Sequence, residues 1–133
     1  MEFKKTFNIH NIKEQFSEQF PFLKIEFYTN EHKKEEGSSI TDQLNEATLL
    51  SEINPGMIET EVMVDPDMTV ASFEKLMREK FDFNVQVFRK SNDLWLQTSA
   101  TDNWTLDKQN GKGGRSTLDY DIDPVNISDF DLD

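Results

Sequence analysis

A glycine-rich run near the C-terminus is the first stretch of this sequence whose residue types could do chemistry. Residues 111–115 read GKGGR, and a glycine-rich loop with a lysine can bind phosphate through its backbone amides. Such a loop lies between a strand and a helix, and its lysine is followed by serine or threonine. Here Gly113 follows Lys112, while Pro124 and the alternating residues around it oppose a helix. The sequence therefore predicts a flexible linker over residues 111–117.

Alternating aspartates after this run resemble the opening of a calcium-binding loop. Residues 119–123 read DYDID, and clustered carboxylates are the ligands that calcium prefers. The loop also needs glycine at its sixth position and a bidentate glutamate at its twelfth. Those positions hold Pro124 and Phe130, so we predict no metal site. Residues 118–133 are instead expected to form an acidic and hydrophobic tail.

No other residues have the spacing of a catalytic or metal-binding group. The two histidines, His10 and His32, fit neither a ligand set nor a triad, and Glu35 and Glu36 are typical of a solvated loop. There is no cysteine, which excludes thiol chemistry. We therefore expect no catalytic residue and no cofactor. A carboxylate-based enzyme is the alternative, because such a site needs only two carboxylates at the right separation.

The charge of the chain excludes some classes of partner. Its net charge is −12, and all 14 lysines and arginines lie at or before Arg115, whereas six of the 26 acidic residues follow it. Nucleic-acid and anionic-membrane binding depend on lysine and arginine, so neither is expected. The N-terminus lacks a signal-peptide pattern, no apolar run could span a bilayer, and disulfides are impossible. These features predict a cytoplasmic protein.

The tail alternates its aspartates with apolar residues, which a merely solubilising segment would not need. It could add as a strand to a sheet edge of its own subunit. It could also add to a sheet edge of a neighbouring subunit, and that exchange would make a homodimer. Alternatively it could bind a basic partner, as an inhibitor or chaperone would. Of the two tryptophans, Trp95 and Trp104, either would mark a contact surface if exposed, although core packing is the simpler expectation. The candidate partner-binding residues are Leu118, Tyr120, Ile122, Phe130 and Trp104.

The helices and strands that would position these residues are predicted to form a unit that occurs twice in the chain. In the first copy Asn8 caps a helical stripe of apolar residues that ends at Phe20, and residues 23–28 then alternate as a strand. In the second copy Thr69 caps the same stripe, which ends at Phe81, and a strand follows at residues 85–88. Residues 101–104, TDNW, also resemble residues 41–44, TDQL.

Two more strands complete the expected fold. Residues 58–64 alternate at period two, and residues 94–98 follow the second-copy strand after a short turn, as in a hairpin. The fold class is therefore α+β, a two-layer sandwich in the order α-β-β-α-β-β. It would have one four-stranded antiparallel sheet with two main helices on one face. The domain would span residues 1–110, with repeat units at about 8–64 and 69–106.

Four motifs in the second copy resemble a family of small uncharacterised bacterial proteins. They are the helix that ends in phenylalanine (Phe73–Phe81), VQVFRKS (Val85–Ser91), the WL-x-T strand (Trp95–Thr98) and DxWTL (Asp102–Leu106). The resemblance covers roughly the first 110 residues, and the duplication is similar to the α-lytic protease prodomain-like fold. It implies a fold without a catalytic residue, since that fold hosts unrelated functions. Its RNA-binding relatives use a GxxG loop between helices. Gly111 and Gly114 have that spacing but lie in the predicted linker.

Taken together, these patterns favour a non-enzymatic protein-interaction or regulatory module. The free sheet face, the sheet edges and the tail would bind the partner.

Overall fold

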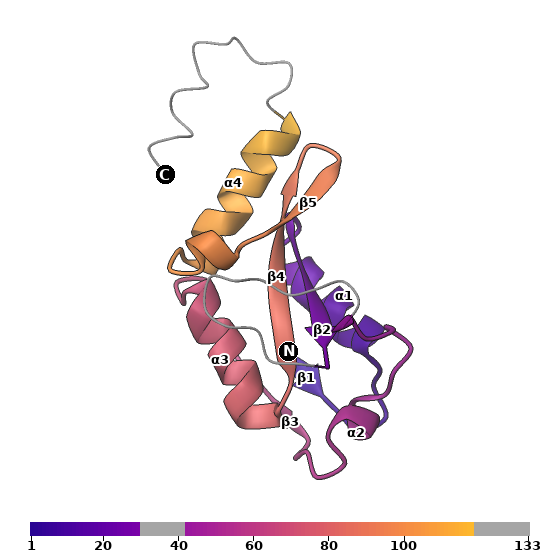
Figure 1. Cartoon of the computed structure of the whole chain (residues 1–133). Helices are drawn as coiled ribbons and strands as arrows, with labels where there is room; N and C mark the ends of the chain where they lie inside the picture. Colours follow the sequence, from indigo (N-terminus) through magenta and orange to yellow (C-terminus); the bar gives the residue numbers. More distant parts are fainter. Residues whose placement is uncertain (30–41, 119–133) are drawn as a thin grey trace, which may run out of the picture.

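The computed structural model describes residues 1–29 and 42–118 and has an α+β architecture (Figure 1). In the described ranges, no helix is long and apolar enough to cross a membrane. The elements are β1 (Glu2–Phe3), α1 (Ile9–Gln19), β2 (Leu23–Tyr28), α2 (Leu50–Ile53), β3 (Thr60–Glu61), α3 (Val70–Phe81), β4 (Asn84–Ser91), β5 (Leu94–Gln97), a 3₁₀ turn at Ser99–Thr101 and α4 (Leu106–Leu118).

The two amphipathic helices form where the sequence predicts them. Asn8 caps α1 in a reciprocal pair of bonds with Asn11, each backbone N–H donating to the other side-chain oxygen at 2.9 Å. Thr69 caps α3 by accepting from the Ser72 N–H at 3.1 Å. At its other end α3 stops at Asp82, whose φ of 59° is left-handed. Local capping and the apolar stripe therefore fix both helices.

The strands of the described residues form two sheets, so the single four-stranded sheet predicted from the sequence is not confirmed. One sheet has the order β2-β4-β5, and the other pairs β1 with β3. Within the predicted strand at 58–64, only Thr60 and Glu61 form a strand, and they pair with Phe3 and Glu2 of β1. Met1 is held there by two bonds to Val62, at 2.7 and 2.8 Å.

The predicted hairpin of β4 and β5 is confirmed. Ser91 pairs with Leu94 across a turn in which Asn92 has a φ of 53°. Asparagine tolerates this left-handed conformation better than most residues. The pairing ends near Val87, whose N–H donates to the buried Glu74 carboxylate at 3.0 Å. The hairpin is therefore fixed at its turn by a local signal and at its far end by a side chain from α3.

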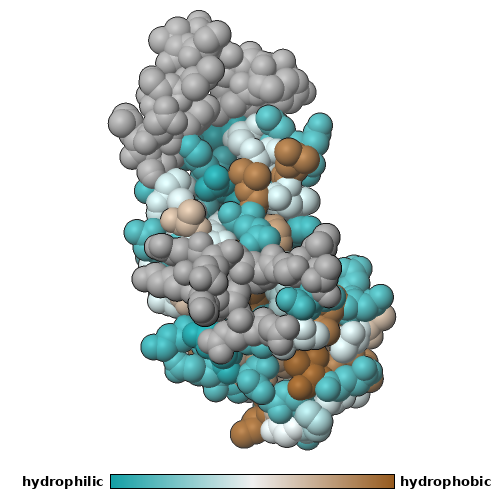
Figure 2. Space-filling view, viewed as in Figure 1, coloured by the Kyte–Doolittle hydropathy of each residue, from teal (hydrophilic) through white to brown (hydrophobic). Residues whose placement is uncertain are grey.

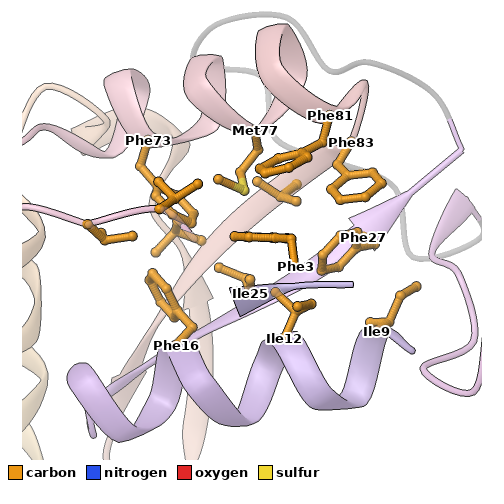
Figure 3. Close-up of a cluster of buried hydrophobic side chains, with 14 of the residues drawn as sticks. Phe3, Ile9, Ile12, Phe16, Ile25, Phe27, Phe73, Met77, Phe81 and Phe83 are labelled. Carbon is orange, nitrogen blue, oxygen red and sulfur yellow. The ribbon is translucent and has the colours of Figure 1, made fainter. Parts of the chain in front are cut away.

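One hydrophobic core lies between α1, α3 and the helix-facing side of the three-stranded sheet (Figure 3). Phe3 from β1 stacks on Phe81 of α3 with ring centroids 4.2 Å apart, and Phe81 stacks on Phe83 at 5.3 Å. Phe16 of α1 and Phe73 of α3 lie 5.0 Å apart. The two halves of the chain therefore share a single core.

The predicted linker at residues 111–117 is wrong, because these residues lie inside α4. Leu106 and Gln109 are buried on this helix, and Gly113 lies directly against Phe22. Three glycines lower the intrinsic tendency of the segment to form a helix. Tertiary packing outweighs that tendency, and glycine is what lets the helix backbone approach Phe22.

Two pairs of helix starts bind each other in the same way. Ile9 N–H donates to Thr48 O at 3.0 Å, and Leu50 N–H donates to Phe7 O at 2.9 Å. The starts of α3 and α4 repeat the arrangement: Val70 N–H reaches Trp104 O at 3.0 Å, and Leu106 N–H reaches Met68 O at 2.9 Å. Each start thus satisfies amides that a helix leaves unpaired.

This pairing aligns the two halves of the chain differently from the predicted match of residues 41–44 with residues 101–104. The β-bridge of Asn8 with Leu49 corresponds to the bridge of Thr69 with Thr105, so Leu49 and Thr105 are the structurally equivalent positions. Duplication of the unit stays a prediction. The matching hydrogen bonds at the two pairs of helix starts are the structural similarity between the halves.

Candidate functional site

The outer edge of β5 is the described surface best suited to bind another chain. β5 is the last strand in its sheet, and no strand in the described ranges pairs with its outer side. Lys90 donates its N–H to Phe22 O at 2.9 Å, away from β5. Because Trp95 lies opposite Lys90 in the register, the backbone groups of Trp95 point to the outer edge. An extended segment could hydrogen-bond to them.

One face of the hairpin carries cations over aromatic rings, and we call it the Lys–Trp face: Lys24, Phe88, Lys90 and Trp95. The ammonium of Lys24 lies 5.1 Å from the Trp95 ring centroid and 5.3 Å from that of Phe88. The ammonium of Lys90 also lies 5.1 Å from the Trp95 ring centroid. The half-buried Trp95 thus holds two positive charges near the edge. Lys24 also contacts the Glu26 carboxylate at 3.2 Å, so Lys90 is the better placed of the two to meet an external anionic group.

The other face of β5 is apolar and open to solvent. Leu94 is 67% exposed and Leu96 is 40% exposed, although both are large hydrophobic residues. Figure 2 shows hydrophobic atoms over the hairpin, bordered by hydrophilic ones. Exposed leucines side by side on an edge strand favour contact with another chain. β5 therefore presents a cationic face and an apolar face to the same outer edge.

Trp104, a predicted contact residue, is half-buried between two cations of its own chain. The Lys108 ammonium lies 4.3 Å from its ring centroid and the Arg89 guanidinium lies 5.6 Å from it. Arg89 also donates to the Gln109 side-chain oxygen at 2.8 Å, and burial lowers the pKa of Arg89. Trp104 is therefore engaged within the chain, joining β4 to the start of α4.

Away from the edge, the sheet face that bears Lys24 is more buried than the sequence predicts. Glu26, Tyr28 and Gln86 lie on it and are 5%, 3% and 0% exposed. Burial raises the pKa of Tyr28 to about 12, and the negative charge of Glu26 adds to the rise. Lys13 contacts Glu26 at 3.0 Å, which gives that buried carboxylate a counter-charge.

The second partner of Lys13 is Glu46, whose side chain is half exposed. The two groups lie 2.8 Å apart, and this hydrogen bond lowers the pKa of Glu46. Burial by itself would lower the pKa of Lys13, but its hydrogen bonds to Glu46 and Glu26 outweigh burial, so the pKa is raised. His10 lies beside the same group, 3.3 Å from Glu46 and 2.6 Å from Glu14.

A shallow hollow gathers carboxylates, as the alternative of an enzyme requires. It holds about 270 Å³ and is lined by Glu2, Glu59 and Glu61 beside the buried Phe3. All three carboxylates are exposed to solvent, and Glu59 already accepts from the Lys5 N–H at 2.9 Å. Over residues 1–29 and 42–118, no group of three or more metal-ligating side chains is present. The hollow therefore lacks the desolvation that sets apart an acid and a base.

The remaining sequence candidates lie elsewhere or outside the described residues. GKGGR is helical, so it cannot form a phosphate loop. Leu118 is the last residue of α4, while Tyr120, Ile122 and Phe130 lie outside the described residues, as do His32, Glu35 and Glu36. Sequence reasoning missed Lys24, Lys90 and the two leucines, because only the register of the strands brings them together.

Comparison with models of protein families, with curated proteins and with solved structures finds no match for this chain. The resemblance to a bacterial family and to the prodomain-like fold therefore stays a prediction.

Proposed function

We propose that this protein is a non-enzymatic interaction or regulatory module that binds an extended peptide segment along β5. The observation that carries the proposal is the two-sided character of this edge strand. Trp95 and the lysines lie on one face, and the exposed Leu94 and Leu96 lie on the other. An added strand gains affinity from backbone hydrogen bonds and specificity from its alternating side chains.

The chemistry of the edge selects the kind of segment. A strand added beside β5 would present alternate side chains to opposite faces of the sheet. The residues on the Lys–Trp face should be acidic, because Lys24 and Lys90 lie there, and those on the other face should be apolar. A segment that alternates acidic and apolar residues fits both faces at once. The net charge of −12 opposes a nucleic acid, which needs a predominantly basic surface, so the attraction for an acidic segment is local to Lys24 and Lys90.

A synthetic probe tests the proposal. The fluorescein-labelled peptide LDYDIDPV alternates acidic and apolar residues, and LKYKIKPV is its charge-reversed control. We expect saturable binding of the first peptide and none of the second, followed by fluorescence anisotropy. A short edge contact is small, so a dissociation constant in the range of about 1–100 μM is expected. Salt should weaken the binding, because the lysines are near the surface.

Two chains are titrated, the unmodified protein and the variant Y120P/I122P. The substitutions leave the net charge unchanged and remove the same pattern from the protein's own tail. Adding L94D/L96D to the variant should abolish binding of LDYDIDPV, because it places charge on the apolar face. Equal binding of both peptides, or no binding by either chain, would contradict the proposed function.

A further inference from the structure

We infer that residues 119–123 of the same chain are a ligand of the β5 edge, so that the protein carries an internal competitor for its partner. This inference rests on the proposed function and adds the identity of one occupant. Residues 119–123 read DYDID, which is the alternation of acidic and apolar residues that the edge selects. The aspartates would face Lys24 and Lys90, while Tyr120 and Ile122 would face Leu94 and Leu96.

The described end of α4 is placed beside the hairpin. Ser116 donates from its hydroxyl to Lys90 O at 3.0 Å, on the edge of β4 that faces away from β5. Three residues before it, Gly113 packs against Phe22 and Arg89. In Figure 1 the last turn of α4 lies at the same end of the molecule as the β4–β5 turn. Residue 119 therefore follows a helix that ends beside the hairpin, and the segment reaches the outer edge of β5 by passing the β4–β5 turn.

The segment matches β5 in length. Five extended residues span about 16 Å, and the four residues of β5 span about 13 Å, at roughly 3.3 Å per residue. A short tether gives an effective concentration of about 1 mM or more. A contact with a dissociation constant near 100 μM as a free peptide would therefore be mostly occupied in the intact chain. A partner would have to displace the segment.

Competition with the probe tests the inference on full-length chains. We expect LDYDIDPV to bind Y120P/I122P at least tenfold more tightly than it binds the unmodified protein. The matched control I127P/L132P carries the same kind of change farther along the tail and should bind like the unmodified protein. Hydrogen exchange of the Trp95 amide gives an independent readout. That amide should exchange faster in Y120P/I122P and at the unmodified rate in the control.

The outcomes separate the two proposals. Equal probe affinities in all three chains, with equal exchange at Trp95, would overturn the inference and leave the proposed function standing. If no chain binds the probe, the proposed function fails, and exchange at Trp95 alone then decides the inference. Light scattering tests whether the segment acts within its own chain, for which a monomer is expected. A dimer that Y120P/I122P dissociates would assign the edge to a neighbour's tail and overturn the same-chain inference.

Discussion

At the scale of single residues, Lys13 is the side chain whose loss should cost most on the surface of α1. Its ammonium lies 3.0 Å from the buried Glu26 and 2.8 Å from Glu46. Among the described residues, Lys13→Met would leave the Lys24 ammonium, at 3.2 Å, as the one counter-charge of Glu26. Because a buried carboxylate that loses a partner pays part of its desolvation cost, we expect the free energy of unfolding to fall by about 1–3 kcal/mol. Urea denaturation measures the change.

The control for this prediction is Lys75→Met. Lys75 pairs with Glu79 at 3.5 Å on α3, and both side chains are largely exposed. An exposed pair of this kind contributes about 0.5 kcal/mol or less. If the two substitutions destabilise the protein equally, Glu26 does not depend on Lys13.

Ionisation of Tyr28 should make the protein less stable as the pH rises above about 10. Its pKa is raised to about 12 by burial and by Glu26, whereas a free phenol titrates near 10. The unfolded chain therefore ionises first as the pH rises. The stabilisation is fully present below about pH 10 and is lost between about pH 10 and 12. Absorbance at 295 nm should show a late ionisation that Tyr28→Phe removes and Tyr120→Phe retains.

At the scale of elements, the glycines of α4 make opposite predictions within one helix. A Cβ added at Gly113 would lie 2.9 Å from Phe22 Cβ and 3.0 Å from Phe22 O, whereas one added at Gly111 would meet only the Arg115 side chain, at 3.5 Å. Gly113→Ala should therefore destabilise the protein by about 1–3 kcal/mol through overpacking. Gly111→Ala should stabilise it by up to about 1 kcal/mol, because alanine favours the helix.

Thermal unfolding followed by circular dichroism checks the pair. Since both substitutions make the same chemical change in the same helix, opposite signs would show that the contact with Phe22 decides the outcome. A stabilising Gly113→Ala would mean that α4 does not pack closely on Phe22.

These elements also show what the sequence could predict. The helices α1 and α3 and the β4–β5 hairpin were predictable, because caps, apolar stripes and turn residues are local signals. α4 was not, because the reason for its glycines is Phe22, about 90 positions away in the sequence. β1 is too short to show any periodicity, so its pairing with β3 could not be predicted from the sequence.

The candidate surface was predictable only in part. The alternation in the tail and the presence of Trp104 can be read from the chain. The Lys–Trp face cannot, because Lys24 lies about 70 positions before Trp95 and meets it only through the register of three strands. Long-range pairing of this kind leaves no periodic trace in a single sequence.

At the scale of the whole molecule, the shared core predicts that both halves unfold together. Phe16 belongs to the first half and Phe73 to the second, and their rings lie 5.0 Å apart in the core shown in Figure 3. Phe16→Ala should cost about 3–5 kcal/mol and lower the midpoint of thermal unfolding by on the order of 10 °C. Both tryptophans lie in the second half, so their fluorescence reports on the half that the substitution does not change.

Because α1 and α3 bury their apolar stripes in the same core, Phe16→Ala should shift the tryptophan transition as far as the far-ultraviolet circular dichroism transition. Met63→Ala is the control, since Met63 is 86% exposed and its loss should shift neither. If the tryptophan transition stays at its original midpoint while the helical signal melts in two steps, the halves are separate folding units. The coincidence of the two transitions thus decides whether the repeated units are independent or parts of one cooperative core.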